Sequence, residues 1–229
     1  MTRERSPVPF DAGYFRKKAE KGERFTTAEA FAHIYETNHW AGKDSVSGEG
    51  SDLVQTAAVR QELANILKEF NVSVFLDLPC GDFGWMSSLE LPVDAYIGGD
   101  IVEDLVRRNR ELYGNERRKF MVLDITGDTL PAADLLFCRD CLVHFSFEDT
   151  GKALRTVRGS TIRHILTTTF PECEKNDYIV TGDWRVINLE RPPFNFPKPL
   201  RLINERCTEG GGTYADKSLG LWEVRSLPA

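Results

Sequence analysis

The apolar residues of the first 70 positions recur at helical spacing. In "FTTAEAFAHIYETNHW" one helical face collects Phe25, Ala28, Phe31, Ala32 and Tyr35. In "LVQTAAVRQELANILKEF" a second face collects Leu53, Ala57, Leu63, Ile66, Leu67 and Phe70. The intervening "AGKDSVSGEGSD" is typical of a loop, and long loops in compact domains are often functional. Residues 1–70 are therefore predicted to form a helical cap with a lid, although Ser51 or Asp52 could simply cap the second helix.

From Val72 onward, short apolar runs alternate with helical patterns. The expected strands are "VSVFLDL", "AYIGGDI", "KFMVLDI", "ADLLFCRD" and "RHILTTTF". Helices are expected in "EDLVRRNRELYG", in "CLVHFSFEDTGKALRTVRGS" and, briefly, after Gly84. This alternation predicts an α/β fold with a doubly wound, mostly parallel sheet.

The last 60 residues break the alternation. Residues 171–199 are proline-punctuated and predict an irregular insertion. "LRLINERC" and "SLGLWEVRS" then predict two strands joined by the glycine-rich "TEGGGTYADK". We expect a seven-stranded sheet that ends in an antiparallel C-terminal strand. Residues 71–229 would be its Rossmann-like core, within a single domain that spans 1–229.

Composition narrows the class of protein. The 229 residues carry 29 basic and 35 acidic side chains, a net charge of −6, so no basic footprint for nucleic acid is expected. No apolar run approaches the roughly 20 residues of a membrane span, and no apolar segment follows the basic N-terminus. Five cysteines at scattered spacings favour a reducing, cytoplasmic location. Cys138 and Cys141 lack a second pair to complete a zinc site, and we interpret both as small buried residues.

The loop after the first strand, "LDLPCGDFGWM", has features of a nucleotide loop but carries carboxylates. Gly81 and Gly84 let the backbone approach a ligand closely. Asp77 and Asp82 disfavour a pyrophosphate, and Pro79 replaces the first glycine of G-x-G-x-x-G. Carboxylates here would attract a ligand that carries an ammonium and a sulfonium, such as S-adenosylmethionine.

Two further strand ends carry carboxylates. Asp100 ends the second strand 19 residues after Gly81, where it could accept both hydrogen bonds of a ribose diol. Asp124 ends the third strand, and beside the Ile125 N–H it could bind an adenine amino edge. The ribose feature is shared with NAD sites, so it indicates a nucleoside without choosing between the two.

From about Val72 to Val224 the chain resembles the class I S-adenosylmethionine-dependent methyltransferases. The matching stretches are "DLPCGDFG", "GGDI", "LDI", "FCRDCLVHF" and "KSLGLWEV". Pro79 and the displaced Gly84 depart from the usual first motif, which leaves the contacts of the loop open. The predicted cofactor-binding residues are Asp77, Pro79, Gly81, Asp82, Trp85, Asp100, Ile101, Asp124, Ile125 and Arg139.

A narrower resemblance rests on the length and on "NHWAGKDSVSGEGSD" and "RDCLVHF". These stretches are similar to the small sugar O-methyltransferases of actinobacteria, including those that methylate the 1-hydroxyl of methylated mannosides. The resemblance implies methyl transfer to a hydroxyl of a small saccharide. It also implies a magnesium ion near the acceptor, for which Asp140 and Asp183 are the available carboxylates. Association as a homodimer is a further expectation.

"RDCLVHF" supplies the catalytic candidates, Asp140 and His144, since it follows the fourth strand. A helix beginning there would place the two side chains, four residues apart, on one face. Neutral His144 could take the proton of a hydroxyl, because its reference pKa is about 6.5. Alternatively, His144 is a satisfied helix histidine and Asp140 a helix N-cap. His33 and His39 could reach the substrate, but both are interpreted as surface histidines.

In "RPPFNFP" an arginine replaces the acidic or amide residue of amino-group methyltransferases, so we interpret this stretch as a rigid substrate loop. Trp184, Phe194 and Phe196 could stack against a sugar face, or could pack over the sheet edge. Three rival functions remain. They are transfer to a phenol or amine, a non-catalytic S-adenosylmethionine-binding module that acts through a partner, and an NAD-dependent oxidoreductase, which the loop carboxylates disfavour.

Overall fold

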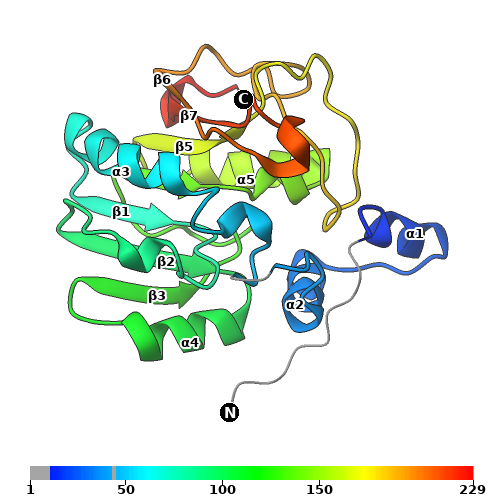
Figure 1. Cartoon of the computed structure of the whole chain (residues 1–229), viewed down its shortest axis with the longest axis horizontal. Helices are drawn as coiled ribbons and strands as arrows, with labels where there is room; N and C mark the ends of the chain where they lie inside the picture. Colours follow the sequence, from blue (N-terminus) through cyan, green and yellow to red (C-terminus); the bar gives the residue numbers. More distant parts are fainter. Residues whose placement is uncertain (1–10, 43–44, 229) are drawn as a thin grey trace.

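A seven-stranded sheet forms the centre of the computed structural model, which describes residues 11–42 and 45–228 (Figure 1). In chain order the strands are β1 (Val74–Asp77), β2 (Ala95–Asp100), β3 (Arg118–Val122), β4 (Leu135–Cys138), β5 (His164–Thr169), β6 (Arg201–Asn204) and β7 (Ser218–Glu223). Their order in space is β3-β2-β1-β4-β5-β7-β6. Strands β1 to β5 pair in parallel, and β7 lies antiparallel between β5 and β6. The predicted sheet is confirmed.

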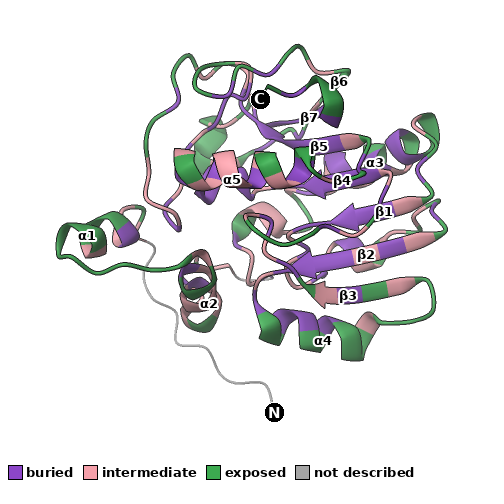
Figure 2. Cartoon of the chain, turned by 180° about the vertical axis from the view of Figure 1, so that it is seen from behind, coloured by how far each residue is buried: buried purple, intermediate pink, exposed green. Residues whose placement is uncertain are grey.

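Helices cover both faces of the sheet. The helices that pack on these faces are α3 (Ala57–Glu69), α4 (Glu103–Tyr113) and α5 (Phe147–Arg158), and they are preceded in the chain by α1 (Tyr14–Glu20) and α2 (Thr27–Thr37). On one face, α3 and α4 bury Leu63, Leu67 and Val106 against Phe75 and Phe137 of the sheet. On the other face α5 packs Ala153 and Val157 into a cluster with Leu76, Leu136 and Trp222. The central strands are consequently buried on both sides (Figure 2), which explains their continuous hydrophobic runs.

Two predicted helices are shorter than expected. After Gly84 there is only a 3-10 turn, Met86–Ser88, because the Ser87 and Ser88 hydroxyls donate to carbonyls three residues back. Helix α5 begins at Phe147 rather than near Cys141, since the Ser146 side chain caps it by accepting from the Asp149 N–H at 3.1 Å. The residues before it form a second 3-10 turn, Leu142–His144.

The N-terminal helices α1 and α2 lie beside the carboxyl ends of the parallel strands (Figure 1). A capping box at Thr26 and Glu29 starts α2. His33 and His39 are not surface histidines as predicted: His39 is buried, and the half-buried His33 ring stacks on Tyr14 at 4.9 Å. An aromatic cluster therefore holds α1 to the segment that follows α2.

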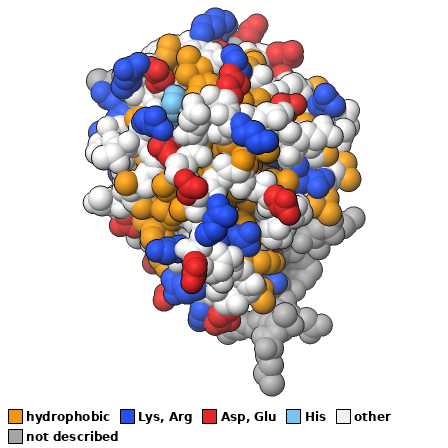
Figure 3. Space-filling view, turned by 90° about the vertical axis from the view of Figure 1, so that its left-hand side faces the viewer, with side chains coloured by type: hydrophobic (Ala, Val, Ile, Leu, Met, Phe, Trp, Pro, Cys, Tyr) orange, Lys and Arg blue, Asp and Glu red, His pale blue; other side chains and the backbone are white. Residues whose placement is uncertain are grey.

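On the side opposite these helices, basic and acidic groups are interspersed with apolar ones (Figure 3). Across the part of the chain that the structure describes, none of the helices has the length and apolar character needed to span a membrane. All five cysteines are free thiols, and Cys138 and Cys141 are buried as predicted.

Candidate active site

The loop after β1 lies close to the lid. Gly81 has φ +53°, a conformation that favours glycine, and a Cβ atom there would meet Ser47 Oγ at 2.4 Å. Asp82 fastens the two loops together, because its Oδ2 accepts from the Ser45 hydroxyl at 2.9 Å and from the Val46 N–H at 3.2 Å. The glycine-rich loop and the lid thus form one wall, and at least part of the Asp82 charge is used within the protein.

Two buried carboxylates follow at the ends of β1 and β2. Asp100 accepts from the Gly81 N–H at 3.0 Å and the Val102 N–H at 2.9 Å, and burial raises its pKa to about 6. Asp77 accepts from the Tyr96 hydroxyl at 2.5 Å, and burial raises its pKa to about 8. A carboxyl group with so high a pKa is poised to ionise when a cation is brought against it.

All ten residues predicted to bind the cofactor line a single cavity at these strand ends. Their roles stay a prediction, but their convergence makes one binding site for them possible. The fit to S-adenosylmethionine rests on the buried carboxylates Asp77 and Asp100 and on the close backbone at Gly81. Helix α2 and the predicted lid also line this cavity, through Phe31, Ile34, Trp40, Ser47 and Ser51. The contribution of α2 was not predicted, and its only signals in the sequence were the apolar face of α2 and the Trp40 that follows it.

A second cavity meets the first. Trp40, Ser47 and Asp140 line both. The second cavity is walled by aromatic rings and charged groups, namely Phe170, Trp184, Tyr214, His144, Lys217, Glu49 and Glu209. A ligand in the first cavity and one in the second could therefore touch where the cavities join.

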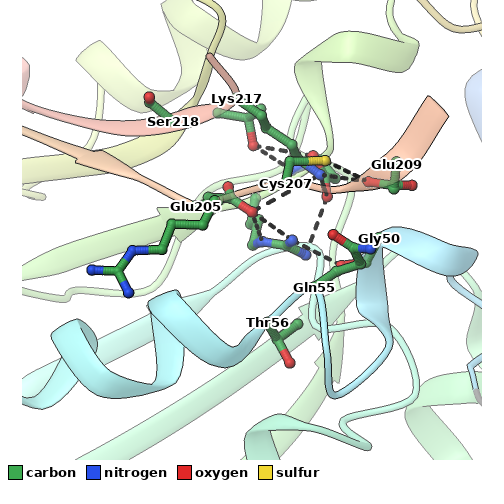
Figure 4. Close-up of polar contacts among 12 residues, drawn as sticks. Gly50, Gln55, Thr56, Glu205, Cys207, Glu209, Lys217 and Ser218 are labelled. Atoms are coloured by element: carbon green, nitrogen blue, oxygen red, sulfur yellow. Dashed lines mark hydrogen bonds and ion pairs between the residues drawn. The ribbon is translucent and has the colours of Figure 1, made fainter. Parts of the chain in front are cut away.

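Asp140 lies at that junction within a buried ion-pair cluster. Its Oδ2 is 2.7 Å from Lys217 Nζ and 3.1 Å from Arg139 Nη1, and these cations lower the pKa of Asp140 to about 2. Arg139 Nη2 also donates to Glu205 at 2.7 Å and to the Gly50 carbonyl of the lid at 2.8 Å. Figure 4 shows Gly50 of the lid close to Glu205 and Lys217, which lie next to the ends of β6 and β7. The Asp140 carboxylate is therefore ionised at neutral pH, and its lowered pKa makes it a weak base for a hydroxyl.

His144 reaches the second cavity from the 3-10 turn. Its Nδ1 lies 3.1 Å from the Asp183 carbonyl oxygen, which can only accept, so Nδ1 carries the proton and Nε2 keeps its lone pair. The ring stacks on Trp40 at 4.3 Å. Burial lowers the pKa of His144 to about 4. The imidazole is neutral at physiological pH and can accept a proton.

The helical argument that paired Asp140 with His144 is wrong. Asp140 has φ +51°, outside any helix, and His144 ends a 3-10 turn. Both side chains nevertheless line the second cavity, because the turn brings them there by another path.

The proposed magnesium ligands also need correction. The Asp183 carboxylate accepts from the Phe15 and Arg16 N–H groups at 2.9 and 3.1 Å, at the start of α1. Asp140 is already neutralised by two cations. Within residues 11–42 and 45–228, no group of three or more His, Cys, Asp or Glu side chains could hold a metal. These residues do not fit a magnesium site.

The three aromatic residues predicted to contact the substrate lie in two different places. Trp184 lines the second cavity. Phe194 and Phe196 do not stack on a ligand: both are buried in the core, where Phe196 meets Trp222 edge to face at 5.3 Å. For these two residues the alternative of packing is the correct one.

The raised pKa of Asp77 gives a test of this electrostatic description. The folded-state pKa of about 8 exceeds the ordinary value of 3.8, so between these values the folded chain holds a proton that the unfolded chain has released. Stability should therefore fall as pH rises through that window, by at most about 1.4 kcal/mol per pH unit. Urea unfolding of wild type and Asp77→Asn from pH 5 to 8 checks this. As pH rises, the free energy of unfolding of wild type should fall relative to that of Asp77→Asn. A difference between the two free energies that stays constant with pH would contradict the assignment.

No protein-family model matches the chain, and neither does the sequence of any curated protein. Solved structures do match in fold. The N-methyltransferase NodS from Bradyrhizobium japonicum WM9 has a TM-score of 0.55 at 12% identity, over 76% of this chain and 98% of its own. The methyltransferase domain of bacterial CtHen1 has a TM-score of 0.52 at 12% identity, over 75% and 100%. PigF, solved with S-adenosylhomocysteine, has a TM-score of 0.58 at 14% identity, over 91% and 65%. The chain therefore has the class I fold of the S-adenosylmethionine-dependent methyltransferases.

Proposed function

We propose that this protein transfers a methyl group from S-adenosylmethionine to a hydroxyl of a small saccharide. The 1-hydroxyl of a methylated mannoside is the specific candidate. The observation that carries the proposal is the meeting of two cavities at Trp40, Ser47 and Asp140. Every residue predicted to bind the cofactor lines the first cavity, and the neutral His144 lines the second.

In this proposal the first cavity binds the cofactor at the strand ends, where Asp77 and Asp100 face its positive and hydroxyl groups. When bound, S-adenosylmethionine supplies an electrophilic methyl group. His144 Nε2 removes the proton of the acceptor hydroxyl, and the Asp183 carbonyl keeps the imidazole in the required tautomer. Trp40 stacks on the ring and fixes its orientation.

The second cavity supports a saccharide acceptor through its mixed walls. Trp184 and Tyr214 offer flat apolar surface, while Asp140 and Lys217 offer hydrogen-bonding groups. Saccharides present both kinds of surface, with C–H faces and hydroxyl edges. Flat aromatic walls would also accept a phenol, so this alternative is retained as an outcome of the test.

An acceptor panel with a methyl-labelled donor tests the proposal. Mannose, methyl mannosides, catechol and tyramine would each be incubated with the purified chain, and the products identified by mass spectrometry. We expect transfer to a saccharide hydroxyl above the rate without protein. Transfer to catechol or tyramine alone would redirect the proposal to phenols or amines. Binding of S-adenosylhomocysteine without any transfer would favour the non-catalytic module.

A further inference from the structure

Lys217 is a buried cation that nevertheless lines the second cavity. It immediately precedes β7, and its side chain is only 6% exposed. Its Nζ lies 2.7 Å from Asp140 Oδ2, at the junction of the two cavities. The remaining carboxylates near it, Glu209 at 3.6 Å and Glu205 at 3.9 Å, are beyond hydrogen-bonding distance.

An ammonium group has three N–H donors and no acceptor. Among the residues that the structure describes, the Lys217 ammonium donates one hydrogen bond, to Asp140. Surrounding carboxylates raise the pKa of Lys217 and keep it charged despite its burial. Lys217 can therefore give a hydrogen bond to a ligand in the second cavity but cannot take a proton from it.

We propose that Lys217 donates a hydrogen bond to the acceptor atom that receives the methyl group and so selects a hydroxyl over an amine. This inference rests on the proposed function. It assigns Lys217 to binding the reacting oxygen, and it gives a chemical reason why the acceptor would be a hydroxyl.

The selection follows from counting lone pairs. A hydroxyl oxygen has two lone pairs, so one can accept from Lys217 while the other attacks the methyl carbon. A neutral amine has a single lone pair, which a hydrogen bond from Lys217 would occupy. Attack by an amine also places positive charge on nitrogen beside the ammonium of Lys217, which is unfavourable.

With a hydroxyl acceptor the step balances. The oxygen forms a bond to the methyl carbon while the carbon–sulfur bond breaks, and its electron pair stays on the sulfur of S-adenosylhomocysteine. The hydroxyl proton passes to His144 Nε2. The charge that develops on oxygen as this proton leaves is stabilised by Lys217, which keeps all its own protons.

Amino sugars test the selection in wild-type protein, since one molecule offers both kinds of acceptor. Mannosamine and glucosamine would be incubated with labelled donor, beside mannose and glucose, at a pH where part of the amine is neutral. We expect O-methyl products from the amino sugars and no N-methyl product. An N-methyl product would overturn the inference and leave methyl transfer intact. No transfer to any of the four sugars would count against both the inference and the proposed saccharide acceptor.

Variants then test the residue itself with the best acceptor. Lys217→Gln should lose about 10- to 100-fold in kcat/KM for the acceptor, because a charged hydrogen bond to the reacting oxygen is lost. Lys217→Arg keeps charge and donors and should lose less. Affinity for S-adenosylhomocysteine should stay within about threefold. Lys152→Gln is the matched control, since Lys152 is an ion-paired lysine on α5 that lines neither cavity. Unchanged kcat/KM in Lys217→Gln, or an equal loss of cofactor affinity, would contradict the assigned role.

Discussion

His144→Ala is expected to lower kcat at least about 10²-fold, the lower end of what general-base assistance contributes. The reason is the geometry of the second cavity. Nδ1 donates to the Asp183 carbonyl, so Nε2 keeps the lone pair that the proposed base needs. Two cations hold Asp140 ionised with a lowered pKa, which makes Asp140 the weaker base. Affinity for S-adenosylhomocysteine should change little, since His144 does not line the first cavity.

His164→Ala is the matched control. His164 starts β5 and lines neither cavity, so its removal should leave kcat near the wild-type value. Steady-state kinetics of folded variants, with folding checked by circular dichroism, decides between the outcomes. A near-wild-type kcat in His144→Ala would remove the residue from the chemistry and pass proton removal to water.

The expected pH dependence of kcat follows from the burial of His144. From the sequence, a step in rate near the ordinary histidine value is expected, but burial lowers the pKa of His144 to about 4. A group with a depressed pKa is neutral at every pH well above it. With saturating cofactor, kcat should therefore show no His144 ionisation above about pH 6, and should fall only as pH drops toward 4. A step near pH 6.5 that disappears in His144→Ala would show that the imidazole is more hydrated than its burial implies.

Glu205→Ala is expected to destabilise the fold by about 3–5 kcal/mol, the usual cost of breaking a buried ion pair from one side. The Glu205 side chain is 1% exposed and accepts from Arg139 Nε and Nη2 at 3.1 and 2.7 Å. Removing it leaves Arg139 buried with Asp140, which is already shared with Lys217.

Urea unfolding measures this effect. Glu223→Ala serves as the control because its carboxylate pairs with Arg225 at 2.8 Å on the surface. Exposed ion pairs contribute little to stability, so its change should be far smaller. Equal effects of the two substitutions would mean that the cluster at Glu205 is hydrated rather than buried.

The sequence predicted the features that depend on local pattern. Short apolar runs alternating with helical faces determine the parallel sheet, and a residue that ends such a strand, or follows within two positions as Asp124 follows β3, must lie at the carboxyl edge of the sheet. For that reason Asp77, Asp100 and Asp124, which are distant in sequence, could all be assigned to one cavity.

Features that depend on long-range pairing were not predictable. The Asp183 carboxylate looks like a metal ligand in the sequence, but it accepts hydrogen bonds from the Phe15 and Arg16 N–H groups in the first turn of α1, 168 and 167 positions earlier. Phe194 and Phe196 carry the same apolar signal whether they stack on a sugar or pack in the core. Nothing in the local sequence predicts that Lys217 lines a cavity, because its ion pair is with Asp140, 77 positions away.

The most direct test of the whole account is a calorimetric titration of the wild-type chain with S-adenosylhomocysteine and, separately, with NAD. We expect saturable binding of S-adenosylhomocysteine at one site per chain and no binding of NAD. Asp100→Ala should weaken that binding by about tenfold or more, since a charged hydrogen-bond acceptor is worth about 1.5–3 kcal/mol. Binding of NAD in place of S-adenosylhomocysteine, or Asp100→Ala binding as tightly as wild type, would contradict the assignment of the first cavity.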